Sequence, residues 1–210
     1  HRYFCAVIFL GGILKLEKKR VSATKILCEC AIMLALSIAL SYVIIYEAPM
    51  GGSVTLVSML PVMFVGVKHG YKWGLGTSLL FAAFQLIQSI IKGNVFVYCT
   101  NASMVIICVL FDYILPFGIL GLTAIACTRG RGFNRIKILT VFAVLIAVRF
   151  VCHYITGVFI WGQWAEGMST YLYSLIYNGT YMLPELVITV AVAWVLTLYK
   201  PVRVLLCQEA

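Results

Sequence analysis

A single carboxylate stands inside a long apolar stretch of this sequence. Asp112 lies within the run MVIICVLFDYILPFGILGLTAIAC, which is long enough to cross a bilayer. An ionised side chain at membrane depth is costly, so it usually faces a bundle interior or a wet cavity and meets a partner there. The chain has only seven acidic residues. Asp112 therefore predicts a site for a cationic or hydrogen-bond-donating ligand; the alternative is a structural acid paired with Arg149 or with a hydroxyl in the bundle core.

A second group of polar and aromatic residues follows further along the chain. Arg149 and His153 are one helical turn apart and share a helix face. His153 and Trp161 are two turns apart, which places an imidazole and an indole on roughly one side of the same helix. The full series is Arg149, His153, Tyr154, Trp161, Gln163, Trp164, Tyr173 and Asn178.

These side chains, together with Asp112 and Tyr113, carry the groups that a flat cationic heteroaromatic ligand requires. A carboxylate neutralises charge, imidazole and amide groups satisfy ring nitrogens and amines, and indole or phenol faces attract a cation. Taken singly, His153 is explained as a hydrogen-bonded core residue and Trp161 as part of the aromatic belt of a membrane protein. The combination favours a binding site.

The sequence contains no motif for nucleotide hydrolysis, for a metalloprotease or for a hydrolase. We therefore expect no catalytic residues, no bound metal and no cofactor. No two of the eight cysteines have the spacing of a metal site, and all lie scattered among apolar residues, where they behave as small hydrophobes. Energy for uphill transport would come from an ion gradient or from a partner.

The composition predicts the elements that must position these residues. The 210 residues are 63% hydrophobic, against roughly 45–50% in soluble domains, and the mean hydropathy is +1.03. We predict an all-α integral membrane protein with six transmembrane helices and no interrupted helix or internal repeat. The predicted spans are Ile26–Tyr46, Val54–Val67, Trp73–Ile91, Ser103–Cys127, Ile138–Ile160 and Ser174–Tyr199.

The basic residues give the orientation of these spans. They cluster before the first span, between the second and third, between the fourth and fifth, and after the sixth, whereas the other side has Lys92 alone. By the positive-inside rule both termini are cytoplasmic. The net charge of +9 is then a topology signal, and we do not expect nucleic acid as a partner.

Two regions follow from this layout. Residues 22–203 form the predicted six-helix substrate-binding domain in the membrane. Residues 1–21 have an uncertain status, because the apolar part, Tyr3–Leu14, is too short to span a bilayer as a helix and has no clear signal-peptide cleavage site.

The first span carries a separate pattern. Ala31, Ala35 and Ala39 recur at every fourth position, and small residues at this spacing form a flat ridge that another helix can approach closely. The ridge predicts either packing inside the bundle or docking to another membrane subunit.

At this point the chain resembles a known family, the thiamine-specific substrate-binding (S) components of energy-coupling-factor (ECF) transporters, the ThiT family. The resemblance covers roughly residues 22–200. It rests on ECAIMLAL in the first span, on LFDYILPFGILGL in the fourth, and on HYITGVFIWGQWA followed by YSLIYNG. The spacings from His153 to Trp161 and from Tyr173 to Asn178 are the most specific part.

The resemblance implies a function and a set of partners. It implies that thiamine is captured at the extracellular side of the bacterial plasma membrane, and that partner subunits drive its import with ATP. These partners are a transmembrane scaffold subunit and two ABC-type ATPases, and the scaffold would dock on Ala31, Ala35 and Ala39. The chain itself would be no enzyme.

The resemblance also implies ligand-binding roles for individual residues. Asp112 would engage the polar and cationic groups of the ligand, with Tyr113 beside it. His153, Tyr173 and Asn178 would hydrogen-bond the ligand, Trp161 would stack on a ring, and Gly157 would permit close approach. Family members can carry tryptophans in the first outer loop and in the third span; the nearest equivalents here are Ser53 and Phe81, and Gln85 is a further polar candidate.

Three alternatives stay open from the sequence. One is an S component for a thiamine precursor or another vitamin. The second is a stand-alone secondary transporter, against which the lack of an inverted repeat or interrupted helix argues. The third is a membrane enzyme or chaperone using Asp112 and His153 as an acid–base pair, against which the lack of an accompanying nucleophile or metal set argues.

Overall fold

The computed structural model describes residues 22–49, 51–93, 98–126 and 133–207. The main helices are α2 (Ala23–Ser41), α3 (Leu60–His69), α4 (Tyr71–Lys92), α7 (Arg135–Phe159), α8 (Thr170–Leu196) and α9 (Lys200–Cys207). Between α4 and α7 runs a continuous helical span built from α5 (Ala102–Cys108), η2 (Val109–Ile114), α6 (Leu115–Gly118) and η3 (Ile119–Ala126). Two short strands, β1 (Ile44–Glu47) and β2 (Ser53–Thr55), and a 3₁₀ turn, η4 (Trp161–Trp164), complete the described elements.

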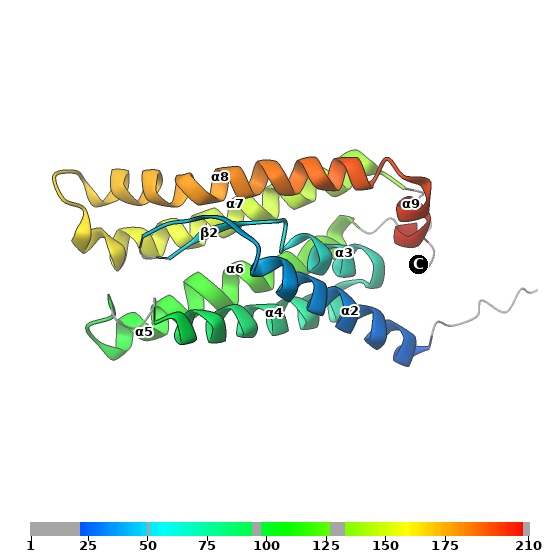
Figure 1. The fold of residues 1–210 in the computed structure, drawn as a ribbon, viewed down its shortest axis with the longest axis horizontal. Coiled ribbons are helices and arrows are strands. Elements are labelled where there is room, and N and C mark those ends of the chain that lie inside the picture. The colour runs from blue at the N-terminus through cyan, green and yellow to red at the C-terminus, as the bar shows by residue number, and fades with distance from the viewer. Residues whose placement is uncertain (1–21, 50, 94–97, 127–132, 208–210) are drawn as a thin grey trace, which may run out of the picture.

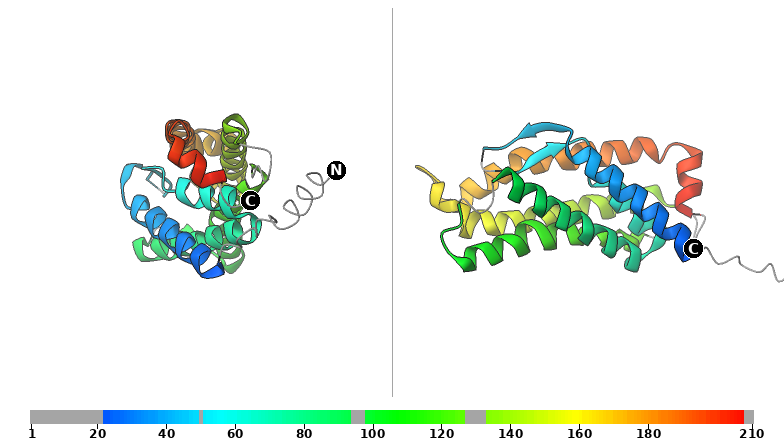
Figure 2. Two further views of the ribbon diagram at one scale, coloured as in Figure 1. Left: turned by 90° about the vertical axis from the view of Figure 1, so that its right-hand side faces the viewer. Right: turned by 60° about the horizontal axis from the view of Figure 1, so that its bottom comes forward.

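The helices form an elongated bundle whose long axis is shared by most of them (Figure 1; Figure 2). Within the described residues, five helical segments are long and apolar enough to cross a membrane, and α3 is a shorter apolar helix. The prediction of an all-α membrane protein with six helices is therefore confirmed in outline. Residues 1–21, whose status the sequence left uncertain, lie outside the described residues.

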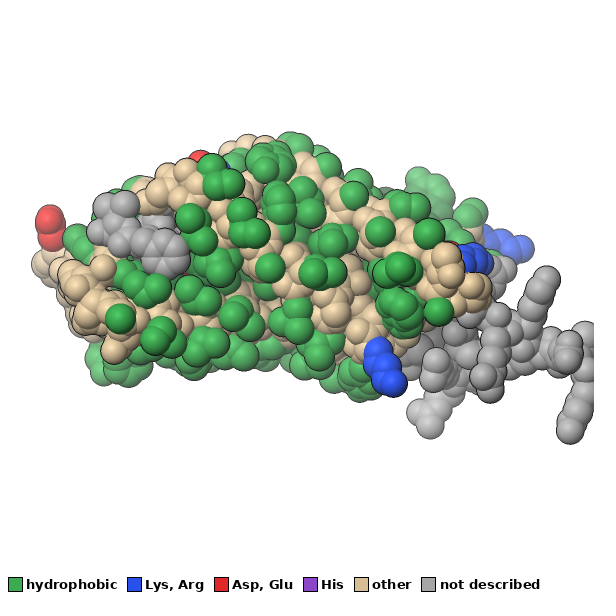
Figure 3. Space-filling view, turned by 90° about the horizontal axis from the view of Figure 1, so that it is seen from below, with side chains coloured by type: hydrophobic (Ala, Val, Ile, Leu, Met, Phe, Trp, Pro, Cys, Tyr) green, Lys and Arg blue, Asp and Glu red, His purple; other side chains and the backbone are tan. Residues whose placement is uncertain are grey.

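The outer surface fits a bilayer. Hydrophobic side chains cover the middle of the face shown in Figure 3, and lysine or arginine side chains gather at the end near the chain termini. This end is the one predicted to be cytoplasmic from the positions of the basic residues. At the same end Glu29 on α2 accepts hydrogen bonds from Lys68 (Nζ, 2.7 Å) and contacts His69 (Nε2, 2.9 Å), which ties α2 to α3.

A β-hairpin replaces the junction of the first two predicted spans. The prediction that Ile26–Tyr46 is helical throughout is wrong after Ser41, and the second predicted span becomes helical only at Leu60. Tyr46 pairs with Val54 and Glu47 with Ser53 in antiparallel register. The β-branched run at Val43–Ile45 favours a strand, and the glycines at 51 and 52 adopt positive φ angles of 98° and 86° that suit a tight turn.

The fourth span is irregular, whereas the sequence indicated no interruption. Its middle, η2, is a π-helical turn in which the Leu115 N–H donates to the Leu110 carbonyl, five residues earlier. Pro116 has no N–H and cannot donate to the Asp112 carbonyl as an α-helix would require. A wider turn at this point resolves that conflict, and such turns are frequent at functional sites.

Small residues allow the short helix α3 to pack closely against α4 and η3. A Cβ placed on Gly74 would lie 2.6 Å from the Gly121 carbonyl oxygen and 2.6 Å from the Gly66 Cα. Thr123 adds a buried hydrogen bond from its hydroxyl to the Met63 carbonyl (2.6 Å). This crossing fixes the base of the bundle beneath the polar residues of the fourth span.

The alanine ridge lies on the outside of the bundle. Ala31, Ala35 and Ala39 are all exposed, whereas Cys30, Ser37 and Ser41 on the other face of α2 are buried. Of the five long spans, α2 is the least buried in this protein. Packing inside the bundle, one of the two sequence interpretations, is therefore not the role of these alanines.

Candidate ligand-binding site

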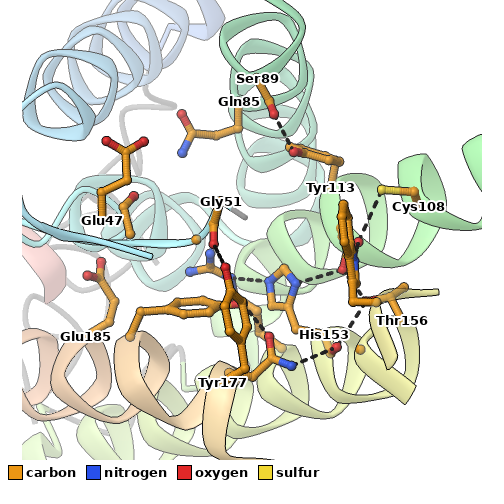
Figure 4. Close-up of a pocket in the computed structure, with 18 of the residues that line it drawn as sticks. Glu47, Gly51, Gln85, Ser89, Cys108, Tyr113, His153, Thr156, Tyr177 and Glu185 are labelled. Carbon is orange, nitrogen blue, oxygen red and sulfur yellow. Dashed lines mark hydrogen bonds and ion pairs between the residues drawn. The ribbon is translucent and has the colours of Figure 1, made fainter. Parts of the chain in front are cut away.

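A polar cavity opens in the half of the bundle opposite the termini. Its volume is about 140 Å³, and it is lined by residues of the hairpin, α4, the fourth span, α7, η4 and α8. Figure 4 shows side chains from these elements converging on His153. The cavity brings together seven of the residues selected from the sequence: Asp112, Tyr113, His153, Gly157, Trp161, Tyr173 and Asn178.

Asp112 is the centre of the hydrogen-bond network in this cavity. Its Oδ1 accepts from His153 Nδ1 at 3.0 Å and also from the Thr156 hydroxyl. Its Oδ2 accepts from Cys108 Sγ at 3.2 Å and from Trp161 Nε1 at 3.4 Å. The side chain is only 12% exposed. Four protein donors therefore take the place of most of the water that would surround an exposed carboxylate.

The π-helical turn explains how Asp112 reaches these donors. The wider turn belongs to the segment that carries Asp112 and Tyr113, and both side chains line the cavity. The Tyr113 hydroxyl donates to Ser89 on α4 at 2.7 Å. The fourth span thus connects α7 on one side of the cavity with α4 on the other.

Arg149 determines the protonation of His153. The Arg149 Nε–H donates to His153 Nε2 at 3.3 Å, so this ring nitrogen carries a lone pair. The hydrogen of the neutral ring then sits on Nδ1 and points at Asp112 Oδ1. Arg149 itself is buried, with its guanidinium 4.3 Å from the centre of the Phe117 ring. We infer that His153 is an oriented neutral donor to the carboxylate.

Helix α8 supplies the amide and phenol groups of the cavity. Asn178 Nδ2 donates to the Ser174 carbonyl (2.9 Å) and to the His153 carbonyl (3.2 Å), and its Oδ1 accepts from the Tyr181 hydroxyl (2.5 Å). The rings of Tyr173 and Tyr177 stack with centroids 5.7 Å apart. The amide is thereby fixed in one orientation, with one acceptor position on Oδ1 left for a ligand.

The structure gives a packing role to Gly157 that the sequence did not indicate. A Cβ at this position would collide with the Ser174 hydroxyl and would lie 2.8 Å from Asn178 Nδ2. The glycine therefore lets α7 and α8 approach each other at the level of the cavity. Gly157 also lines the cavity.

The three further sequence candidates fall in different places. Ser53, in the hairpin, and Gln85, on α4, line the cavity. Phe81 does not: it is 0% exposed and packs edge-on against Phe117, with ring centroids 5.5 Å apart. A ring at this position stabilises the core beneath the cavity because α4 turns it toward the fourth span.

Aromatic residues meet at the outer end of the cavity. Trp161 lies 5.6 Å from the ring of Tyr98 and 5.9 Å from Trp164, and Tyr98 also packs on Trp164 at 5.2 Å. Trp161 lines the cavity and bonds to Asp112, so its indole is more than a membrane-belt residue.

Several lining residues were not selected from the sequence. Thr156 and Cys108 bond directly to Asp112, each from one turn of helix away from a selected residue. The helical spacing of Cys108 and Asp112, four residues apart, was a usable signal. Glu185, a buried acid of α8, accepts from the Thr55 N–H (2.6 Å) and hydroxyl (2.9 Å) and so anchors the hairpin to α8.

The charged groups of the lining suit a cation. Three carboxyl groups, of Glu47, Asp112 and Glu185, stand against two cationic side chains, Lys92 and Arg149. Lys92 already pairs with Glu47 at 3.1 Å near the rim. Among the described residues no group of three or more His, Cys, Asp or Glu side chains could hold a metal ion.

Comparison with known proteins assigns the chain. The model of the family described as "Thiamine transporter protein (Thia_YuaJ)" matches residues 27–204. This chain belongs to the thiamine transporter protein family. The resemblance seen in the sequence is thereby confirmed, and this member of the thiamine transporter family is a multi-pass protein of the bacterial plasma membrane that serves transport rather than catalysis.

Individual relatives agree with the family assignment. The thiamine transporter ThiT of Bacillus subtilis (strain 168) is 32% identical over 190 residues, which are 83% of this chain and 91% of that protein. A solved structure of ThiT from Listeria monocytogenes is 20% identical and superposes with a TM-score of 0.66, over 88% of this chain and 98% of that one. At this identity the structural match establishes the fold alone.

Proposed function

We propose that the chain is the substrate-binding membrane subunit of an ECF-type vitamin transporter and that it captures thiamine at the extracellular side. The observation that carries this proposal is the partly buried carboxylate of Asp112, held by four donors in an aromatic-lined cavity of a thiamine transporter family member. Thiamine is a monocation made of two planar heteroaromatic rings, and such a ligand needs one counter-charge, ring faces and a few directed polar groups.

In this proposal each part of the cavity recognises one chemical feature of thiamine. Asp112 neutralises the cation, and the indole of Trp161 stacks on a ring. Tyr113, Tyr173 and Asn178 provide hydroxyl and amide groups for ring nitrogens and the amine, while His153 keeps the carboxylate oriented. No catalytic residue and no cofactor enter the proposal, because ATP is used only by partner subunits.

The side of the cavity formed by α4 and the hairpin is polar. Ser53, Gln85 and the pair Tyr113–Ser89 lie there, where family members can carry tryptophans. We propose that this side makes hydrogen bonds to the ligand in place of stacking. Phe81 supports the fold beneath it and makes no ligand contact.

The exposed ridge on α2 supports the proposed coupling. Ala31, Ala35 and Ala39 face outward, and small side chains permit close approach of a second helix in a membrane. We propose that an ECF transmembrane scaffold subunit docks here and links the chain to two ABC-type ATPases. The ridge and the cavity use different faces of the bundle, so docking and ligand capture can occur together.

Tryptophan fluorescence of the purified chain in detergent tests the ligand. We expect saturable quenching at nanomolar thiamine and weak responses to the isolated pyrimidine and thiazole fragments, because the cavity contacts both rings. A response to one fragment or to another vitamin, without a response to thiamine, would mean that the substrate is a different molecule. The assignment as a substrate-binding membrane subunit would then still stand. Silence to all of them would refute a vitamin-binding role.

Uptake in cells tests the coupling. We expect radiolabelled thiamine uptake by the chain to require co-expression of the scaffold and both ATPases. Uptake of the same size in cells lacking the ATPases, and sensitive to a proton uncoupler, would instead establish a stand-alone secondary transporter.

A further inference from the structure

Two cysteines meet beside the proposed ligand site. Cys108, in α5, is fully buried, and Cys99, just before this helix, is partly buried and packs against it. The two side chains are neighbours in this small cluster, and neither forms a disulfide in the structure. Cys108 Sγ–H donates to Asp112 Oδ2 at 3.2 Å, so this cysteine links the pair to the proposed ligand site.

The segment that carries Cys99 is held on both sides. On one side Tyr98 packs on Trp161 and Trp164. On the other side Asn101 caps α5 through Met104 N–H (2.9 Å) and Thr100 donates to the Met104 sulfur (3.3 Å). These contacts hold Cys99 in place beside Cys108.

We propose that Cys99 and Cys108 form a reversible disulfide that regulates the ligand site. The segment of Cys99 lies at the end of the bundle predicted to face the outside, where small-molecule disulfides persist and thiols are readily oxidised. Cys99 is the accessible member that reacts first, and Cys108 is the buried member that resolves the intermediate.

The exchange reaction balances with a low-molecular-weight disulfide, RSSR, as oxidant. The Cys99 thiolate attacks one sulfur of RSSR, forms a mixed disulfide and releases one RS⁻, which takes up a proton. Cys108 then attacks the Cys99 sulfur, forms the internal bond and expels the second RS⁻. The Cys108 proton passes to the Asp112 carboxylate in front of it and on to solvent. Two protein thiols are oxidised, and RSSR is reduced to two RSH.

Oxidation changes the surroundings of Asp112 directly. The Cys108 sulfur loses its hydrogen and with it one of the four donors to the carboxylate. Its bond to Cys99 also draws the sulfur toward the segment of Tyr98, against the face of Trp161. We expect the oxidised protein to bind thiamine more weakly, a consequence that rests on the function proposed above.

Burial raises the pKa of the Cys99 thiol, so the reaction is run at mildly alkaline pH to supply thiolate. The full chain in detergent is treated with 2-hydroxyethyl disulfide, digested without reduction, and analysed by mass spectrometry. We expect a Cys99–Cys108 cross-linked peptide two hydrogens lighter than the reduced pair, and its loss on adding a reductant. Absence of this peptide, or a link between other cysteines, would overturn the proposal.

Thiamine titrations of the reduced, oxidised and re-reduced protein measure the consequence. We expect the dissociation constant to rise by about threefold or more on oxidation, the order expected for losing one ordinary side-chain hydrogen bond, and to return on reduction. Cys99→Ser should bind as the reduced protein does and ignore the oxidant. Cys152→Ser, a buried cysteine of α7 outside the cavity lining, should still form the link.

The two readouts separate the two proposals. An internal disulfide with unchanged thiamine affinity would overturn its regulatory role. A reduced protein that fails to bind thiamine would refute the proposed function, and the peptide mass would still decide whether the disulfide forms.

Discussion

Replacing Asp112 by asparagine is the most direct test of the site. The substitution keeps the size of the side chain but removes its charge. It also replaces one of the two acceptor oxygens by an NH₂ group. Each oxygen of Asp112 faces two donors, so either orientation of the amide sets a donor against donors.

The structure sets the magnitude. A charge pair about 4–6 Å apart interacts by roughly 3–4 kcal/mol at an effective dielectric of about 20, and by about 1 kcal/mol in bulk water. With a side chain only 12% exposed, Asp112 lies toward the first case. The asparagine amide retains part of this attraction through its dipole. We therefore expect a loss of about 1.4–3 kcal/mol of binding free energy, which is a tenfold to roughly hundredfold rise in the dissociation constant for thiamine.

Isothermal titration calorimetry of the detergent-purified variant measures this loss, with circular dichroism as the check on folding. Glu166→Gln is the matched control: it makes the same change on an exposed acid in the α7–α8 connection, outside the cavity lining, and should bind as the wild type does. Wild-type affinity in a folded Asp112→Asn protein would refute the assignment of Asp112 to the ligand.

Three further predictions concern other parts of the bundle. Ala35→Trp should leave thiamine affinity unchanged and abolish uptake in cells, because it disturbs only the outer ridge; normal uptake would reject docking there. Gly157→Ala should lower stability by about 1–3 kcal/mol, the usual effect of overpacking, since its methyl meets Ser174; an unchanged thermal midpoint would contradict the close α7–α8 approach. Glu29→Gln should cost about 1–2 kcal/mol of stability by leaving Lys68 without its carboxylate, with binding intact; weaker binding at unchanged stability would show that this cluster acts on the cavity.

Much of the fold follows from local sequence. Apolar runs long enough to cross a bilayer define the spans, and the basic clusters between them define the orientation, because both signals depend on transfer of side chains between water and lipid. The same reasoning explains why Asp112 could be selected: a charge within an apolar run needs a partner wherever the run packs. The sequence spacing of His153 and Trp161 is likewise a local property, although α7 ends at Phe159 and Trp161 lies in the turn η4 that follows it.

Other features depend on contacts that local sequence does not report. Val43–Ile45 is apolar enough to extend the first helix, yet the helix ends at Ser41 and Ile44 pairs with Thr55 in a hairpin. Hydrogen bonds from Thr55 to Glu185, 130 residues away, hold this hairpin on α8. From the sequence, Gly157 is interpreted as leaving space for a ligand; the structure shows that it also leaves space for α8 to pack on α7. Phe81 and Gln85 lie one helical turn apart on α4, and only the position of the fourth span decides that the first enters the core and the second lines the cavity.

The sequence by itself determined which residues must leave the lipid, where the chain crosses it and which chemistry the polar groups could supply. The tertiary structure decided which of those groups meet. The donors around Asp112 come from the fourth span, α7 and the turn after it, with α8 locking the opposite wall, and their distances depend on a π-turn and on a glycine contact between helices. Transfer free energies are properties of single residues and can be summed along a chain, whereas a hydrogen-bonded cavity exists only once packing has fixed several segments relative to one another.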